Sequence, residues 1–333
     1  KIDRYKSNYI IDLNAKKNTG NQEVIIKDKN EYAKNDNFIF IQNTDSFVPY
    51  SYNDLLKIIY TTINYGWDFF TFYCPSEYEK CINDVENISK DDITLTHINN
   101  YVHPYNSFTN IKTSIMESGE ITIEINYLYN KEQIKKIENK TNSLLKELVN
   151  DNMTNYEKIK VLHDYIINNA KYDVERNKNG DSKYLSYIAY GPLFEGYATC
   201  NGYTDLMAIY LTKLGIPNYK IATTKSSKSS SNGHIWNAVN LDGKFLHLDL
   251  TWDDPVSDDG KDYLYHKYFL IDTKSLMEVD SGKVEIEDHN IDKNYYLEFN
   301  DKIIEVKKYE EVIITETIND WVCVQTKSTK GWI

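Results

Sequence analysis

Hydrophobic residues in the first third of the chain follow two different periods, which predicts strands and helices together. Residues 38–41 (FIFI) and 68–73 (DFFTFY) are short apolar or aromatic runs typical of strands. From Tyr52 to Asn64 the apolar residues follow helical spacing, and Gly66 marks a stop. A mixture of helices and strands is therefore expected in this part of the chain.

Two alternating segments come next, near residues 109–116 and 120–127. They surround Glu117-Ser118-Gly119-Glu120, a sequence that favours a turn between two paired strands. We therefore expect residues 1–129 to form an N-terminal α+β region. No chemical motif in this region indicates its role.

Helical patterns dominate from about residue 130. Asn130 and Gln133 have the spacing of a capping box, which predicts a helix that runs to about Val149. Thr154 and Glu157 form a second box ahead of another helix. Apolar residues recur at three- and four-residue steps along this second helix, so one face should be buried: Ile159, Leu162, Tyr165, Ile166 and Ala170.

A third helix is predicted to begin near Cys200 and to end at Gly215, with Pro217 just beyond. A thiol in the first turn of a helix lies beside partial positive charge, which favours the nucleophilic thiolate. Asn201 and Gly202 add little bulk near the sulfur, so a substrate could approach it. A lone cysteine is also commonly a buried, inert thiol. Position alone leaves both interpretations open.

A β-hairpin is predicted further along the chain. Residues 235–241 (IWNAVNL) and 244–250 (KFLHLDL) are strand-like, and Asp242-Gly243 between them favours a two-residue turn. In this register Trp236 faces Asp249. Apolar side chains then share one face of the hairpin and offer a core surface: Ile235, Val239, Leu241, Leu246, Leu248 and Leu250.

The other face of this hairpin carries His234, Trp236, His247 and Asp249. His234 and Asp249 become diagonal neighbours, whose backbones lie about 7–8 Å apart, within reach of their side chains. A carboxylate in that place can accept a hydrogen bond from one ring nitrogen and direct the other nitrogen toward a thiol. The sequence therefore predicts a candidate triad of Cys200, His234 and Asp249, although each residue alone has a plainer structural interpretation.

Three segments resemble the signature blocks of the bacterial transglutaminase-like superfamily, in the order and spacing of that family. The resemblance covers about residues 150–272, and it implies that Cys200 is the nucleophile, His234 the general base and Asp249 the residue that orients the histidine. The family often has Gly where Ala198 stands and Gln where Asn201 stands. The three segments are Gly196-Tyr197-Ala198-Thr199-Cys200-Asn201-Gly202-Tyr203, His234-Ile235-Trp236-Asn237-Ala238-Val239 and His247-Leu248-Asp249-Leu250-Thr251-Trp252-Asp253-Asp254-Pro255.

The resemblance implies an α+β fold with a papain/transglutaminase-like core, in which the cysteine-bearing helix packs on an antiparallel sheet. We assign this catalytic domain to residues 130–280 and a small β region to residues 281–333. Trp321 and Gly331-Trp332-Ile333 resemble the end of a bacterial SH3-like module. A few extra strands packed on the catalytic domain are the alternative interpretation of the last region.

The implied activity is thiol-dependent acyl transfer through a thioester, either crosslinking or hydrolysis of protein or cell-wall peptide amides. Trp236 could bind substrate or shield the thiolate and imidazole, although large aromatic residues near clefts are mostly packing residues. Residues 224–233 (TKSSKSSSNG) should form a mobile loop that could gate the cleft or only connect two strands. The alternative function is a catalytically inactive cell-surface binding or scaffold protein that retains the fold.

The charge and composition of the chain argue against nucleic-acid binding and against a membrane span. A formal net charge of -12 argues against a nucleic-acid binder, because such proteins carry a basic face. No run of about 18 apolar residues is present, so no membrane span is expected. The family resemblance, and not the charge, implies a protein or peptidoglycan-peptide substrate and a secreted or cell-surface location, with possible association with the cell wall.

The remaining cysteines and acidic residues suggest no metal centre. Cys74 and Cys81 are close enough in sequence to close a small disulfide loop, although their pairing stays open, and Cys323 should be a packed thiol. HExxH and paired CxxC motifs are absent, and the aspartates at 253–259 do not form an EF-hand pattern. We expect no metal and no cofactor.

Overall fold

The computed structural model describes most of the chain between residues 43 and 280 and short segments beyond it. The described residues are 43–116, 119–223, 233–257, 259, 261–280, 289–290, 313–318, 321–325 and 330–332. The predicted strand at residues 38–41 and the predicted mobile loop at residues 224–232 lie outside them.

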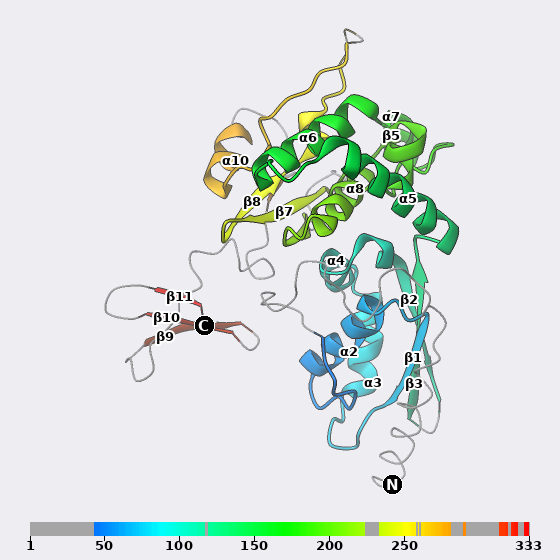
Figure 1. Ribbon diagram of the computed structural model, residues 1–333. Coiled ribbons are helices and arrows are strands. Elements are labelled where there is room, and N and C mark those ends of the chain that lie inside the picture. Colours follow the sequence, from blue (N-terminus) through cyan, green and yellow to red (C-terminus); the bar gives the residue numbers. More distant parts are fainter. Residues whose placement is uncertain are drawn as a thin grey trace.

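The N-terminal part is a three-stranded antiparallel sheet with helices against it (Figure 1). The predicted helix, strand and hairpin are confirmed, and Cys74 and Cys81 form a disulfide between the end of the first strand and the start of a helix. The strand order is β1-β3-β2. The elements are α2 (Tyr52–Asn64), β1 (Phe69–Tyr73), α3 (Cys81–Lys90), α4 (Asp92–Asn100), η3 (Pro104–Asn106), β2 (Phe108–Ile115) and β3 (Glu120–Tyr127).

Both predicted capping boxes are present in the helices that follow. Asn130 and Gln133 bond reciprocally at the start of α5, and Thr154 and Glu157 do so at the start of α6. The elements of this part are α5 (Lys131–Leu148), α6 (Asn155–Asn169), β4 (Lys171–Tyr172), α7 (Val174–Asn179), η4 (Gly191–Glu195), β5 (Tyr197–Ala198), α8 (Cys200–Lys213), β6 (Asn218–Ala222), β7 (Ile235–Leu241), β8 (Lys244–Leu248), α9 (Leu250–Asp253) and α10 (Thr273–Asp280).

Helix α8 packs on the antiparallel sheet β6-β7-β8, so the predicted α+β class with a cysteine-bearing helix on a sheet is confirmed (Figure 1). The two-residue hairpin is confirmed as well, because Leu241 pairs with Lys244 and Val239 with Leu246. Val239 and Leu248 belong to the core that α5, α6 and α8 form on one face.

The second face of the same sheet is also buried, which the sequence did not predict. Trp236 and Ala238 belong to the core of the N-terminal part. Tyr219 of β6 stacks on Tyr101, which directly follows α4, with ring centroids 5.0 Å apart. The face that we expected to be polar is therefore covered by residues 43–129, and its histidines lie in the interior.

A buried ion pair joins the two parts of the molecule. Lys220 Nζ lies 3.1 Å from Asp205 Oδ1, and both side chains are at most 5% exposed. Lys220 also donates to Ser107 Oγ, and Tyr129 donates to the other oxygen of Asp205. Lys220 and Asp205 therefore each have one partner in the N-terminal part and one in the sheet or α8.

A third sheet lies near the C-terminal end, with antiparallel order β11-β10-β9. Its strands are β9 (Ile313–Ile318), β10 (Trp321–Gln325) and β11 (Lys330–Trp332), so Cys323 lies in a strand as predicted. The SH3-like assignment and the domain limits at residues 130 and 280 stay predictions. None of the described helices has the length and apolar character that crossing a bilayer requires.

The buried pair leads to a stability prediction. Lys220→Met should lower the free energy of unfolding by about 3–5 kcal/mol, because it leaves the Asp205 carboxylate buried without a counter-charge. Urea unfolding followed by circular dichroism measures the change. The matched control is Lys136→Met, which removes the exposed partner of Glu132 and should leave the midpoint unchanged. Equal midpoints for both variants would contradict the proposed importance of the buried pair.

Candidate functional site

Cys200 occupies the first position of α8, as the sequence predicts. The first N–H groups of a helix have no partner inside it, so they point toward whatever lies beside the thiol. Gly202 was expected to leave room for a substrate near the sulfur, but the structure gives it a packing role. A Cβ at Gly202 would lie 2.2 Å from the carbonyl oxygen of Ser186, so glycine is required for α8 to pack against that segment.

His234 and Asp249 meet at the open end of the β7–β8 hairpin. His234 precedes β7, and Asp249 directly follows β8 and caps α9 by accepting from the N–H of Trp252. His234 Nε2 donates to Asp249 Oδ2 over 2.5 Å. The side chains are 8% and 1% exposed, so water screens this contact little.

Cys200 completes the group. It lines the same groove as His234, and it helps to raise the pKa of that imidazole. Because Asp249 contacts Nε2, Nδ1 is the ring nitrogen that remains for the thiol. The structure therefore brings Cys200, His234 and Asp249 into one site, as the sequence predicted.

Burial and charge shift the pKa values of His234 and Asp249 in opposite directions. Burial alone lowers the pKa of His234, but the charge of Asp249 and the contact with Cys200 outweigh it and raise that pKa well above its usual value. Burial likewise raises the pKa of Asp249, yet the donors His234 and His289 hold it well below its usual range. The arrangement favours an ionised carboxylate beside a protonated imidazole.

Trp236 lies behind the triad. Its side chain is 1% exposed, it stacks on His234 with ring centroids 5.6 Å apart, and its Nε1 donates to His247 Nδ1. It shields the imidazole, one of the two roles expected of it, while its burial leaves no surface for the predicted contact with substrate. His247 is a fully buried core residue that also bonds Thr273.

Sequence reasoning missed His289. Its Nε2 lies 2.8 Å from the same Asp249 oxygen that His234 contacts, and its Nδ1 lies 2.8 Å from Asp280 Oδ2. His289 stands 40 residues beyond Asp249 in a stretch without a pattern that predicts its place. No local signal could have found it.

A groove of about 530 Å³ opens at Cys200 and His234. One wall comes from the cysteine helix and from strand ends near Ala222, Gly233 and Ile235. The other wall is α4 of the N-terminal part, which contributes Asp92, Ile93, Thr96, Asn99 and Asn100. Among the described lining residues Asp92 is the only one with a full charge apart from the triad, and lysine and arginine are absent.

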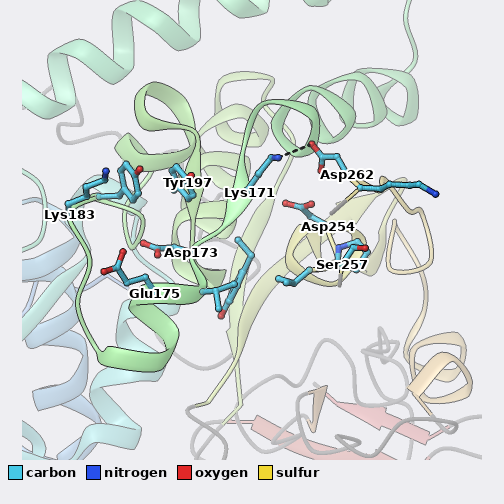
Figure 2. A pocket seen from close by; sticks show the side chains of 14 residues that line it. Lys171, Asp173, Glu175, Lys183, Tyr197, Asp254, Ser257 and Asp262 are labelled. Carbon is cyan, nitrogen blue, oxygen red and sulfur yellow. Dashed lines mark ion pairs between the residues drawn. The ribbon is translucent and has the colours of Figure 1, made fainter. Parts of the chain in front are cut away.

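A second cavity of about 440 Å³ lies beside β4 and β5 (Figure 2). Its lining combines lysines with carboxylates, and Lys171 and Asp262 form an ion pair across it. Burial raises the pKa of Asp254 to about 7, and Tyr203 donates a hydrogen bond to this side chain. Because both signs of charge line the cavity, it favours no single class of charged ligand.

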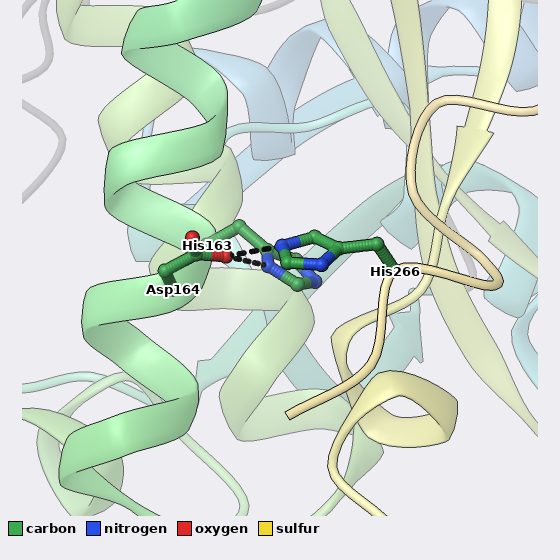
Figure 3. Close-up of side chains that lie close together, drawn as sticks. All are labelled: His163, Asp164 and His266. Atoms are coloured by element: carbon green, nitrogen blue, oxygen red, sulfur yellow. Dashed lines mark hydrogen bonds and ion pairs between the residues drawn. The ribbon is translucent and has the colours of Figure 1, made fainter. Parts of the chain in front are cut away.

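His163, Asp164 and His266 form a cluster apart from the triad (Figure 3). Both imidazoles contact Asp164 Oδ1, at 2.9 and 2.6 Å, and Lys160 Nζ contacts the other oxygen at 2.5 Å. His163 also bonds the buried Asp253. A lysine ammonium 3.2 Å from His266 Nε2 disfavours a bound cation, so the cluster is best explained as an ion-pair network between α6 and the 261–267 segment.

The triad histidine, Asp249 and His289 form a second group of closely spaced potential metal ligands. In this group the carboxylate oxygen lies between two ring nitrogens at hydrogen-bonding distance, which accounts for the spacing. The expectation that the protein uses no metal stays a prediction.

Comparison with known proteins points to one superfamily. Residues 142–250 match the family model of the transglutaminase-like superfamily. Kyphoscoliosis peptidase of Mus musculus is 26% identical over 171 residues, which cover 47% of this chain and 24% of that protein. The chain therefore spans about a quarter of the length of the curated relative it matches.

Two solved structures also resemble part of the chain. One is a TGase, 14% identical with a TM-score of 0.32, over 46% of this chain and 48% of that one. The other is a candidate cysteine protease from Cytophaga hutchinsonii, 12% identical with a TM-score of 0.27, over 43% and 61% of the two chains. These structural likenesses are too small to carry an argument, whereas the match to the family model covers the cysteine helix and both hairpin strands. Residues 142–250 of this chain are therefore similar to the transglutaminase-like superfamily.

Proposed function

We propose that this protein is a thiol-dependent acyl-transfer enzyme in which Cys200, His234 and Asp249 act as a catalytic triad. The observation that carries the proposal is the buried His234 imidazole, which bonds Asp249 through Nε2 and lines one groove together with Cys200. Helix-start thiols beside a histidine are the usual arrangement of cysteine nucleophiles. An inactive scaffold would have no need of a buried ionised pair next to a thiol that lines a groove.

The proposed reaction has two steps. The Cys200 thiolate attacks an amide carbonyl carbon, the C–N bond breaks, and the proton on His234 Nδ1 passes to the departing amine. A thioester on Cys200 remains. Water or a second amine then attacks the thioester, His234 takes the proton of the attacking group, and the thiolate is released. Backbone N–H groups at the start of α8, including that of Cys200, would stabilise the oxyanion.

The N-terminal part is proposed to share in substrate binding. Helix α4 presents Thr96 and Asn99 to the groove across from the thiol. Amide and hydroxyl groups at this place suit hydrogen bonds to an extended peptide, and the lack of described lysine or arginine in the lining does not favour an anionic one. The substrate class that we propose is therefore a protein or a cell-wall peptide bearing a carboxamide or peptide bond.

An extracellular location is part of the same proposal. The Cys74–Cys81 disulfide supports it, because structural disulfides persist mainly in oxidising compartments. The proposed triad serves crosslinking when a second amine is the acyl acceptor and hydrolysis when water is.

A glutamine-containing peptide, supplied with and without a primary amine, tests the reaction. The expected result is loss of ammonia with formation of the new amide or of the glutamate product, detected by mass spectrometry. Only the first product indicates crosslinking. Cys200→Ala should abolish both. If the wild-type protein forms neither product nor a covalent adduct on Cys200 with any amide peptide tried, the scaffold function is favoured.

The charge of Asp249 should set the pH range over which Cys200 is reactive. Asp249→Asn keeps the side-chain shape but removes the charge that raises the pKa of His234, so the imidazolium should be lost at lower pH. The alkaline limb of kcat/KM for the glutamine-containing peptide, whose departing amine takes the proton of this imidazolium, is expected to move down by about one pH unit or more. Asp242→Asn, in the exposed turn of the same hairpin, is the matched control, because asparagine accepts its φ of 54°. An unchanged limb in Asp249→Asn would refute the assigned role.

If α4 forms one wall of the groove, a bulky side chain on α4 should hinder a large substrate more than a small reagent. Thr96→Trp should lower kcat/KM for the peptide by about tenfold, a loss of about 1.4 kcal/mol of transition-state stabilisation. The small reagent iodoacetamide should still label Cys200 at the wild-type rate. Asn83→Trp, on the exposed surface of α3, serves as the control and should change neither rate. Equal slowing of peptide and iodoacetamide would show that the substitution disturbs the triad instead of the groove.

A further inference from the structure

His289 joins two buried carboxylates that come from different elements. Asp249 directly follows β8 as the N-cap of α9, and Asp280 is the last residue of α10. Each accepts a bond of 2.8 Å from a different nitrogen of the His289 ring. His289, Asp249 and Asp280 are all at most 2% exposed, so the chain of hydrogen bonds lies in the interior and reaches His234 at its far end.

The contacts of the ring require a doubly protonated imidazole. An ionised carboxylate only accepts hydrogen bonds, so a ring that bonds a carboxylate through both nitrogens must donate from both. Burial lowers the pKa of His289, but its hydrogen bonds to Asp249 and Asp280 outweigh burial and raise that pKa. Asp280 has a second donor in the hydroxyl of Tyr268 at 2.9 Å, which helps to keep it ionised.

Charge balance gives the two carboxylates different roles. One positive charge on His289 beside Asp249 alone would cancel much of the field that Asp249 exerts on His234. The negative charge of Asp280 on the opposite side of the ring offsets that charge. Asp249 therefore keeps its net effect on His234 while it gains a second donor that fixes the position of its Oδ2.

Aromatic rings fix the orientation of the imidazole. Tyr268 stacks on His289 with ring centroids 5.2 Å apart, and Trp236 meets it edge-on at 5.0 Å. The ring of Trp252 lies at 5.8 Å. The titratable groups that face His289 from the elements around it are Asp249, Asp280, His234, His247 and Tyr268.

We propose that His289 is a positioning residue of the triad, whose imidazolium holds Asp249 toward His234 while Asp280 balances its charge. This proposal rests on the proposed thiol chemistry. It adds to the three predicted residues a histidine and an aspartate that touch neither the thiol nor the substrate and act through Asp249.

Two substitutions of opposite charge test the proposal in the full-length protein. His289→Gln keeps an N–H donor but removes the positive charge, so the imidazolium of His234 should be stabilised. Asp280→Asn removes the balancing negative charge, so the imidazolium should be destabilised. The alkaline limb of kcat/KM for the glutamine-containing peptide, which depends on the His234 proton, is expected to move up in His289→Gln and down in Asp280→Asn, each by about one pH unit. His289→Leu, which also lacks the donor, should slow alkylation at neutral pH, and His289→Gln should restore part of the rate.

A purely structural role predicts different results. Both variants would then lower the melting temperature while leaving the limb in place or moving it in the same direction, and either of these outcomes overturns the proposal. Circular dichroism shows whether each variant folds. If one variant does not fold, the direction in which the alkaline limb of the other variant moves decides between the two roles. The proposed function is judged separately. If wild-type Cys200 shows no alkylation that depends on His234, the thiol chemistry fails; if it does, and the limbs do not separate, only the role of His289 fails.

Discussion

The carboxylate of Asp249 is the constraint on which the site depends. It is 1% exposed, and burial by itself would favour its neutral form. Its Oδ2 accepts from two imidazoles and its Oδ1 accepts from the backbone of α9, so donors surround the charge. Since an unpaired charge in the interior is very costly, the histidines and the carboxylate have to be held together. Orientation of His234 toward the thiol follows from that requirement.

The second constraint is a sheet that is covered on both faces. The helices α5, α6 and α8 pack on one face, and residues 43–129 pack on the other. Covering the second face removes water from Trp236, His247 and the triad histidine, which strengthens the charge interactions there. The same packing places α4 across from Cys200 and makes one wall of the groove. The N-terminal part therefore forms part of the site. The buried ion pair between Lys220 and Asp205 helps to hold that part in place.

Local patterns in the sequence predicted much of this structure. The capping boxes located α5 and α6, and the Asp242-Gly243 turn set the register that makes His234 and Asp249 neighbours. Contacts between distant segments could not be predicted in the same way. His289 and the α4 wall reach the triad from far along the chain, and Gly202 is required by the backbone of Ser186 instead of by substrate. Burial of the polar face of the hairpin was not predicted, because the sequence does not show which segment covers it.

The most direct test of the account is the rate at which iodoacetamide labels Cys200 at neutral pH in the wild-type protein and in His234→Ala. Peptide mapping by mass spectrometry assigns the label. If the imidazole activates the thiol, wild-type Cys200 should react at least about tenfold faster than Cys200 of the variant, in line with the usual contribution of a general base. Equal rates in the two folded proteins would contradict the central claim that sulfur, imidazole and carboxylate act together.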